Sequence, residues 1–118
     1  MGIAGDWYSE QGSHMHLETD PSGAVTGTYT SALGRASGTY PLVGRFDPLR
    51  EAGRGTAIGW TVAWRNDDAD AGSVTSWSGE YRADEQERIS AGWLLTRSAD
   101  APDSWESTMV GQDTFTRR

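Results

Sequence analysis

Short runs rich in threonine, valine, tyrosine and tryptophan recur about every dozen residues along this chain, separated by clusters of glycine, proline, aspartate and serine. No segment carries the apolar spacing of three to four residues that marks an amphipathic helix. This pattern is typical of antiparallel hairpins and predicts an all-β fold. Strands are expected at residues 5–11, 14–20, 24–31, 39–47, 55–66, 73–83, 87–98 and 106–117.

The connections between these strands are short and favour closure of the sheet. The segment from Asp20 to Gly23 supplies a proline that fixes φ and a glycine that accepts a positive φ, as a tight turn requires. Successive hairpins in chain order predict an eight-stranded antiparallel up-and-down β-barrel, because closure removes the exposed edges of an open sheet. The length of 118 residues suits a single domain over residues 1–118.

The charge balance is acidic, with 17 Asp and Glu against 10 Lys and Arg and a formal net charge of −7. Nucleic acid and anionic membranes both attract clustered positive charge, so neither is an expected partner. No apolar segment approaches the roughly 20 residues that cross a bilayer. The lack of cysteine excludes disulfide bonds, thiolate metal sites and cysteine catalysis.

Six tryptophans are a large number for a chain of this size. Each indole buries roughly 150–250 Å² and needs a partner for its N–H group, so packing alone does not account for all of them. Trp7 and Trp60 are interpreted as core at the floor of the barrel. The other four fall in alternating strands or polar loops: Trp64, Trp77, Trp93 and Trp105. Together they predict a hole with aromatic walls.

Side chains alternate along a strand, so one face of each expected strand lines the interior. The inward set mixes large apolar groups with polar ones: Trp60, Val62, Trp64, Ser73, Thr75, Trp77, Trp93, Leu95, Gly111, Asp113 and Phe115. The polar members lie beside tryptophans. A buried polar group costs about 1–3 kcal/mol unless it is hydrogen-bonded. Its partner is expected to be protein, water or a ligand.

The histidines and hydroxyl groups of this sequence are not arranged as a catalytic site. His14 and His16 share the outward face of their strand with Glu18, and no further ligand is evident, so no metal site is expected. The inward hydroxyl groups lack a base to activate them. We therefore expect a protein that is not an enzyme, with no catalytic residue and no cofactor.

Several stretches resemble the avidin and streptavidin family of biotin-binding proteins in order and spacing. They are GIAGDWY at 2–8, VTGTY at 25–29, GTAIGWTVAW at 55–64, WSG at 77–79, WLLT at 93–96 and GQDTFT at 111–116. The resemblance runs from Gly2 to Thr116. It implies an up-and-down barrel that sequesters biotin with high affinity, is secreted, and assembles as a homotetramer built as a dimer of dimers. The signal peptide is expected to be absent from this sequence.

The same resemblance implies which residues contact biotin. Trp64, Trp77 and Trp93 match the indoles around the bicyclic ring system. Trp105 matches an indole that a neighbouring subunit contributes. The polar contacts follow by position: Ser13 and Tyr29 donate to the ureido oxygen, Ser31 and Asp113 accept from the ureido N–H groups, Thr75 faces the thioether, and Ser73 lies near the valerate carboxylate. Leu95 belongs to the inward face of the site.

A lid over the pocket mouth is implied at residues 32–38, including Leu33, Gly34 and Arg35. Arg35 replaces an asparagine of the family, and it either adds a cation near the ligand carboxylate or is solvated. Two further departures concern the site itself. Ser9 replaces an asparagine that supplies a third donor to the ureido oxygen, and Gln11 replaces a leucine at the next inward position. The alternative function is a barrel scaffold with a weakened pocket or an altered small-molecule specificity.

Overall fold

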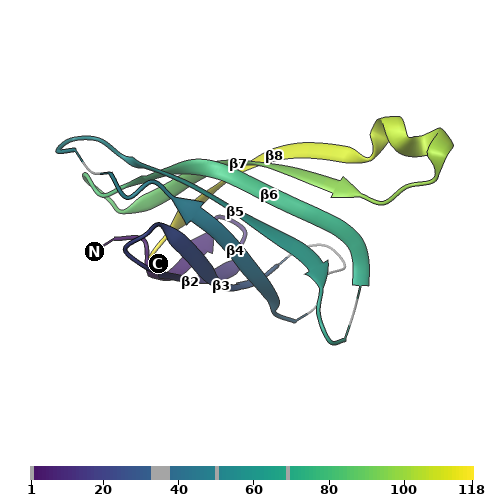
Figure 1. The fold of residues 1–118 in the computed structure, drawn as a ribbon, viewed down its shortest axis with the longest axis horizontal. Coiled ribbons are helices and arrows are strands. Elements are labelled where there is room, and N and C mark those ends of the chain that lie inside the picture. Colours follow the sequence, from purple (N-terminus) through teal and green to yellow (C-terminus); the bar gives the residue numbers. More distant parts are fainter. Residues whose placement is uncertain (1, 33–37, 50, 69) are drawn as a thin grey trace.

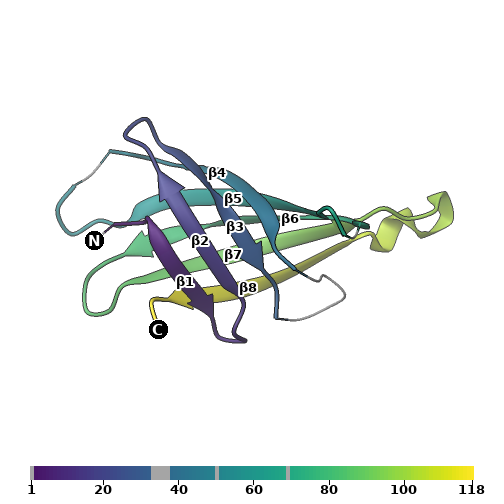
Figure 2. The ribbon, with the colours of Figure 1, turned by 90° about the horizontal axis from the view of Figure 1, so that it is seen from below.

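The chain folds into a closed barrel of eight antiparallel strands paired in sequence order from β1 to β8 (Figures 1 and 2). The structure is a computed structural model that describes residues 2–32, 38–49, 51–68 and 70–118. The elements are β1 (Gly5–Ser9), β2 (His14–Thr19), β3 (Ala24–Thr30), β4 (Tyr40–Phe46), β5 (Thr56–Arg65), β6 (Asp70–Arg82), β7 (Arg88–Arg97), the 3-10 helix η1 (Ala101–Glu106) and β8 (Thr108–Thr116). The predicted all-β barrel is confirmed.

The first strand is shorter than the alternation of side chains predicts. It ends at Ser9 because the chain turns there: the N–H of Ser9 donates to the carbonyl of Ser13 at 2.9 Å, and the N–H of Gly12 donates to the carbonyl of Ser9 at 3.0 Å. Gly12 has a φ of +92°, which a glycine adopts without strain. Gln11 is therefore an exposed turn residue and not the inward strand residue that was expected.

The β7–β8 hairpin projects beyond the rest of the barrel and carries η1 at its tip (Figures 1 and 2). The prediction of a strand from residue 106 is wrong at its start, since Ala101–Glu106 is helical and β8 begins at Thr108. Pro102 is in the first turn of η1, where its missing N–H costs nothing. No residue of η1 is buried, so the helix adds little to the core.

The barrel interior is filled mainly by aromatic and branched side chains. The largest of them are almost fully buried: Trp7, Trp60, Tyr40, Phe115, Met15, Leu17, Leu42, Ile89, Val25 and Val62. The indole of Trp60 stacks on that of Trp77 with ring centroids 5.5 Å apart. The ring of Trp7 meets Tyr81 edge-on at 6.0 Å. The interpretation of Trp7 and Trp60 as core is thus confirmed, although Trp60 Nε1 is buried without a hydrogen-bond partner among the described residues.

The junction between the first and last strands, here called the β1–β8 seam, is the shortest ladder in the barrel. It consists of the pairs Tyr8 with Thr116 and Ser9 with Phe115. By contrast, the β7–β8 ladder runs from Arg88 opposite Thr116 to Thr96 opposite Thr108. The two ends of the described chain lie on the same side of the barrel (Figure 2).

The side chain of Arg117 spans the seam beyond the end of its ladder. Its guanidinium donates to the carbonyl oxygens of Gly2 and Asp6, the latter at 3.2 Å, and its Nε donates to Glu87 Oε1 at 2.9 Å. The same group lies 3.7 Å from the centroid of the Trp7 ring, within cation–π range. One side chain therefore ties β8 to the residues at the start of β1 and to the turn before β7.

Within the described ranges, no helix combines the length and the hydropathy that crossing a membrane requires.

Candidate functional site

Aromatic side chains converge at the end of the barrel where β1, β3, β5 and β7 finish, which we call the Trp64 end. The Tyr29 ring lies 4.9 Å from Trp77 and 5.7 Å from Trp64, and the two indoles lie 6.4 Å apart. Tyr40 meets Trp64 edge-on at 5.1 Å. Four neighbouring strands, β3 to β6, each contribute one of these rings. Three of the residues expected at the site, Tyr29, Trp64 and Trp77, therefore lie in contact with one another.

The indole N–H groups in this cluster are bonded to the polar inward residues. Trp64 Nε1 donates to Thr75 Oγ1 at 2.8 Å, and Trp77 Nε1 donates to Asp113 Oδ2 at 3.1 Å. Thr75 is buried and Asp113 is half-buried. These bonds explain how polar side chains are accommodated on the inner face, because each accepts from an indole that would otherwise be unpaired. They also fix the orientation of both indoles.

A second polar group is formed by the turn between β1 and β2. Ser9 and Ser13 are both buried, and Ser9 Oγ accepts the N–H of Ser13 at 3.1 Å. Ser13 Oγ in turn accepts the N–H of Ala32 at 3.0 Å, and the Ser13 side chain is hydrogen-bonded to Tyr29. The two serines are thereby joined to the aromatic cluster and to the chain that leaves β3.

The environment of Tyr29 keeps its phenol protonated. Burial raises the pKa of Tyr29 above its ordinary value, and the negative charges of Asp113 and Glu10 raise it further, while the bond to Ser13 acts in the opposite direction. The hydroxyl group therefore retains its proton at physiological pH. It can act as a hydrogen-bond donor at the Trp64 end of the barrel.

Trp93 lies across a glycine of the neighbouring strand. In the sheet it is opposite Trp77 on β6 and Gly111 on β8. A Cβ atom at Gly111 would lie only 2.1 Å from Trp93 Cζ2, so a glycine is required for the indole to rest against β8. Trp93 is half-buried and packs at the edge of the core.

The remaining expected residues are less closely tied to the cluster. Ser73 and Leu95 are half-buried on the strand faces that also carry Thr75 and Trp93, and Ser31 is half-buried directly after β3. Trp105 is 82% exposed on η1 and lies outside the barrel. Leu33, Gly34 and Arg35 lie outside the described residues. Hydrogen bonds and ring contacts join seven of the expected residues: Ser9, Ser13, Tyr29, Trp64, Thr75, Trp77 and Asp113.

Two residues of this region were not identified from the sequence. Tyr40 packs against Trp64, and its position two residues before the buried Leu42 on β4 is the signal that would have found it. Glu10 accepts the N–H of Thr114 through its carboxylate at 3.1 Å. No local pattern indicates this second contact, because its partners are 104 residues apart.

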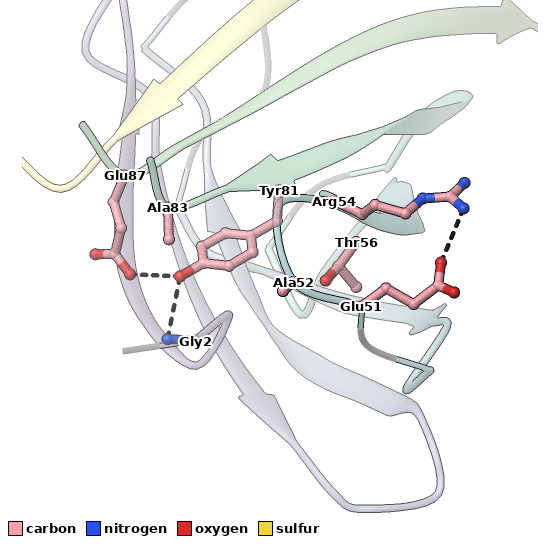
Figure 3. A pocket seen from close by; sticks show the side chains of 8 residues that line it. All are labelled: Gly2, Glu51, Ala52, Arg54, Thr56, Tyr81, Ala83 and Glu87. Carbon is pink, nitrogen blue, oxygen red and sulfur yellow. Dashed lines mark hydrogen bonds and ion pairs between the residues drawn. The ribbon is translucent and has the colours of Figure 1, made fainter. Parts of the chain in front are cut away.

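A separate cavity of about 570 Å³ lies at the opposite end of the barrel, lined by Gly2, Glu51, Ala52, Arg54, Thr56, Tyr81, Ala83 and Glu87 (Figure 3). The hydroxyl of Tyr81 donates to Glu87 Oε2 at 2.7 Å and accepts the N–H of Gly2 at 3.2 Å. The bonds from Arg117 and Tyr81 hold the pKa of Glu87 below its ordinary value. Glu51 pairs with Arg54 at 2.8 Å. This cavity contains none of the expected site residues. Each of its charged side chains is paired, Glu51 with Arg54 and Glu87 with Arg117, which does not line the cavity.

The outward face of β1 and β2 carries a small charged cluster. Asp6 Oδ1 bonds His14 Nε2 at 2.9 Å and His16 Nδ1 at 3.1 Å. The bond to Asp6 raises the pKa of His16. These side chains are substantially exposed, and the described part of the chain holds no group of three or more His, Cys, Asp or Glu side chains placed to bind a metal ion.

The sequence profile of the avidin family matches residues 1–118. The chain is also 32% identical over 118 residues to the protein Afifavidin of Afifella pfennigii, an alignment that covers 97% of this chain and 68% of that relative.

Proposed function

Because this chain belongs to the avidin family, we propose that it binds biotin at the Trp64 end of its barrel and retains it without chemical turnover. The main observation in support of this proposal is that the indole N–H groups are hydrogen-bonded to oriented polar side chains. Trp64 and Trp77 supply apolar walls, and their N–H groups are already bonded to Thr75 and Asp113. Such a combination of apolar walls and a few fixed polar groups is typical of small-molecule sites.

The polar groups are complementary to a cyclic urea. The Tyr29 hydroxyl remains protonated, and together with Ser13 and Ser9 it offers hydroxyl donors to a ureido oxygen. A carboxylate has about four lone-pair sites, so Asp113 retains capacity for a ureido N–H after accepting from Trp77. Ser31 is the proposed acceptor for the second ureido N–H. Trp93, Leu95 and Ser73 extend the site toward the thioether and valerate chain.

Biotin is expected to bind once per chain and to change the tryptophan emission, because indoles of the cluster lose water when the ring system covers them. The melting temperature should rise as well, since a ligand specific for the folded state stabilises that state. Calorimetric and fluorescence titrations measure stoichiometry and affinity together. Pentanoic acid, which has only the acyl chain, is the control and should give no response. A lack of any signal with biotin in large excess would refute the proposed function and favour the alternative of a scaffold with altered specificity.

Assembly is part of the proposal. Leu94 and Val110 are paired across β7 and β8 and are 55% and 76% exposed, and Val74 on the adjacent β6 is 40% exposed. Met109 is 46% exposed on the other face of β8, since it is paired with Leu95. Contiguous exposed apolar groups are typical of protein interfaces. We propose a secreted homotetramer, arranged as a dimer of dimers, in which the Trp105 indole of one subunit closes the pocket of a neighbour.

Replacing Ser9 by asparagine is expected to tighten biotin binding by about 1–3 kcal/mol. The Ser9 hydroxyl is short and its oxygen already accepts the N–H of Ser13, whereas an asparagine amide reaches farther and carries two donors. The gain should appear chiefly as slower dissociation, measured by competition with labelled biotin. The control is Gln11→Leu, which places the family's residue at the other position of departure. It should leave the dissociation rate of biotin unchanged because Gln11 is exposed in the turn. An unchanged or faster release from Ser9→Asn would show that another group already fills this role.

A further inference from the structure

The main-chain pairing of β1 with β8 ends after Ser9. At the next position the side chain of Glu10, not its main chain, bonds to β8. The last main-chain pair is Ser9 with Phe115, and the next residue of β8 toward the Trp64 end is Thr114. Since β1 turns away after Ser9, the main chain of residue 10 is not paired with Thr114. The carboxylate of Glu10 accepts that N–H at 3.1 Å. A backbone donor on the seam is thus satisfied by a side chain of the β1–β2 turn.

This bond joins the two halves of the polar group at the Trp64 end. On one side, Glu10 directly follows Ser9 and belongs to the turn that leads to Ser13. On the other side, Thr114 directly follows Asp113, whose carboxylate accepts the indole N–H of Trp77. The two serines and Asp113 come from opposite ends of the sequence. Across the seam they are connected by the Glu10 bond and the short β1–β8 ladder.

We propose that Glu10 is a positioning residue for ligand retention, holding the turn that carries Ser9 and Ser13 against β8 beside Asp113. This inference rests on the proposed function, because it assigns Glu10 to the same biotin site. Glu10 itself is exposed and need not touch the ligand. Its effect arises because donors and acceptors on the two sides of the ureido group must be held at fixed separation to act together.

The test uses Glu10→Ala, Glu10→Gln and a control, Glu85→Ala. Glutamine keeps the acceptor oxygen and removes the charge, so it is expected to restore the bond. Glu85 is an exposed glutamate in the turn between β6 and β7, at the opposite end of the barrel. Two quantities are measured on the full chain: hydrogen exchange of the Thr114 amide by NMR without ligand, and the dissociation rate of biotin.

In Glu10→Ala, the Thr114 amide is expected to exchange faster and biotin to dissociate roughly threefold to tenfold faster, as for the loss of one modest hydrogen bond. Glu10→Gln should restore both values, and Glu85→Ala should change neither. Unchanged Thr114 exchange in Glu10→Ala would show that the bond is absent and overturn the inference. Faster exchange with unchanged dissociation would overturn the positioning role alone. If the unmodified protein binds no biotin, the proposed function fails and the retention role fails with it, whereas the exchange result still reports on the bond.

Discussion

Replacing Trp105 by alanine is expected to weaken biotin binding by roughly 2–4 kcal/mol, the range for a buried aromatic anchor at an interface, while the barrel stays folded. The side chain is 82% exposed and its helix contributes no buried residue, so the fold does not depend on it. Trp105 belongs to η1, which lies at the tip of the β7–β8 projection (Figure 1). In the proposed assembly the indole covers the pocket of a neighbouring subunit.

The measurement combines biotin calorimetry with light scattering, with and without ligand. Leu49→Ala is the matched control, because Leu49 is also a large apolar side chain, 72% exposed, but lies in the segment after β4. Loss of affinity together with a looser tetramer in Trp105→Ala would support closure across subunits. A monomeric native protein whose Trp105→Ala variant binds biotin with unchanged affinity would show that the site is complete within one chain.

Arg117→Ala is expected to lower the free energy of unfolding by roughly 2–4 kcal/mol, the range for a few charge-assisted bonds lost together with a cation–π contact. The guanidinium bonds the carbonyl groups of Gly2 and Asp6 and the Glu87 carboxylate, and it covers the face of Trp7. The main-chain ladder of the β1–β8 seam is too short to replace these contacts. Urea unfolding should show a lower midpoint with an unchanged slope.

Arg54→Ala is the control for Arg117→Ala. Arg54 pairs with Glu51 at 2.8 Å, but its side chain is 73% exposed, and surface pairs contribute about 0–1 kcal/mol. Equal losses in the two variants would contradict the structural role assigned to Arg117.

The pH dependence of stability gives a second signature of the Arg117 contacts. The bonds from Arg117 and Tyr81 hold the pKa of Glu87 below its ordinary value of 4.5. A carboxylate with a lowered folded-state pKa contributes stability that is present above its unfolded pKa and is lost as the pH falls through the folded value. Arg117→Ala should raise the folded pKa of Glu87. The variant should therefore lose less stability than the unmodified protein on acidification below 4.5.

The alternation of side chains was enough to predict most of the barrel. It separated Trp60, Trp64 and Trp77 from the outward residues, and the burial of each in the structure agrees with that assignment. The prediction for Gln11 was wrong because alternation was extended through a turn that begins after Ser9. The helical segment at Ala101–Glu106 was missed because a 3-10 helix of six residues is too short to leave a periodic pattern.

The contacts that join distant segments could not be predicted. Arg117 is one of two terminal arginines in the sequence, and nothing local distinguishes it from Arg118, which lies 4.4 Å over Tyr8. From the sequence, Glu10 is likewise an ordinary polar residue on the outward face of the strand expected at residues 5–11. Both acquire their roles only when barrel closure brings the first and last strands together. The resemblance to the avidin family supplied the expected ligand contacts, but not these two residues.

The β1–β8 seam also determines when the barrel can close during synthesis of the chain. Its bonds from Arg117 to Asp6 and Gly2 join residues 111 and 115 positions apart, whereas each hairpin closes over a short turn. Contacts of such separation carry the largest loop-closure entropy and form slowly. During synthesis, at about 5–20 residues per second, β1 therefore emerges long before the strand that completes its pairing. Until β8 leaves the ribosome, β1 remains an open edge that can pair with another nascent chain, so the protection of β1 from aggregation during translation depends on the synthesis of β8.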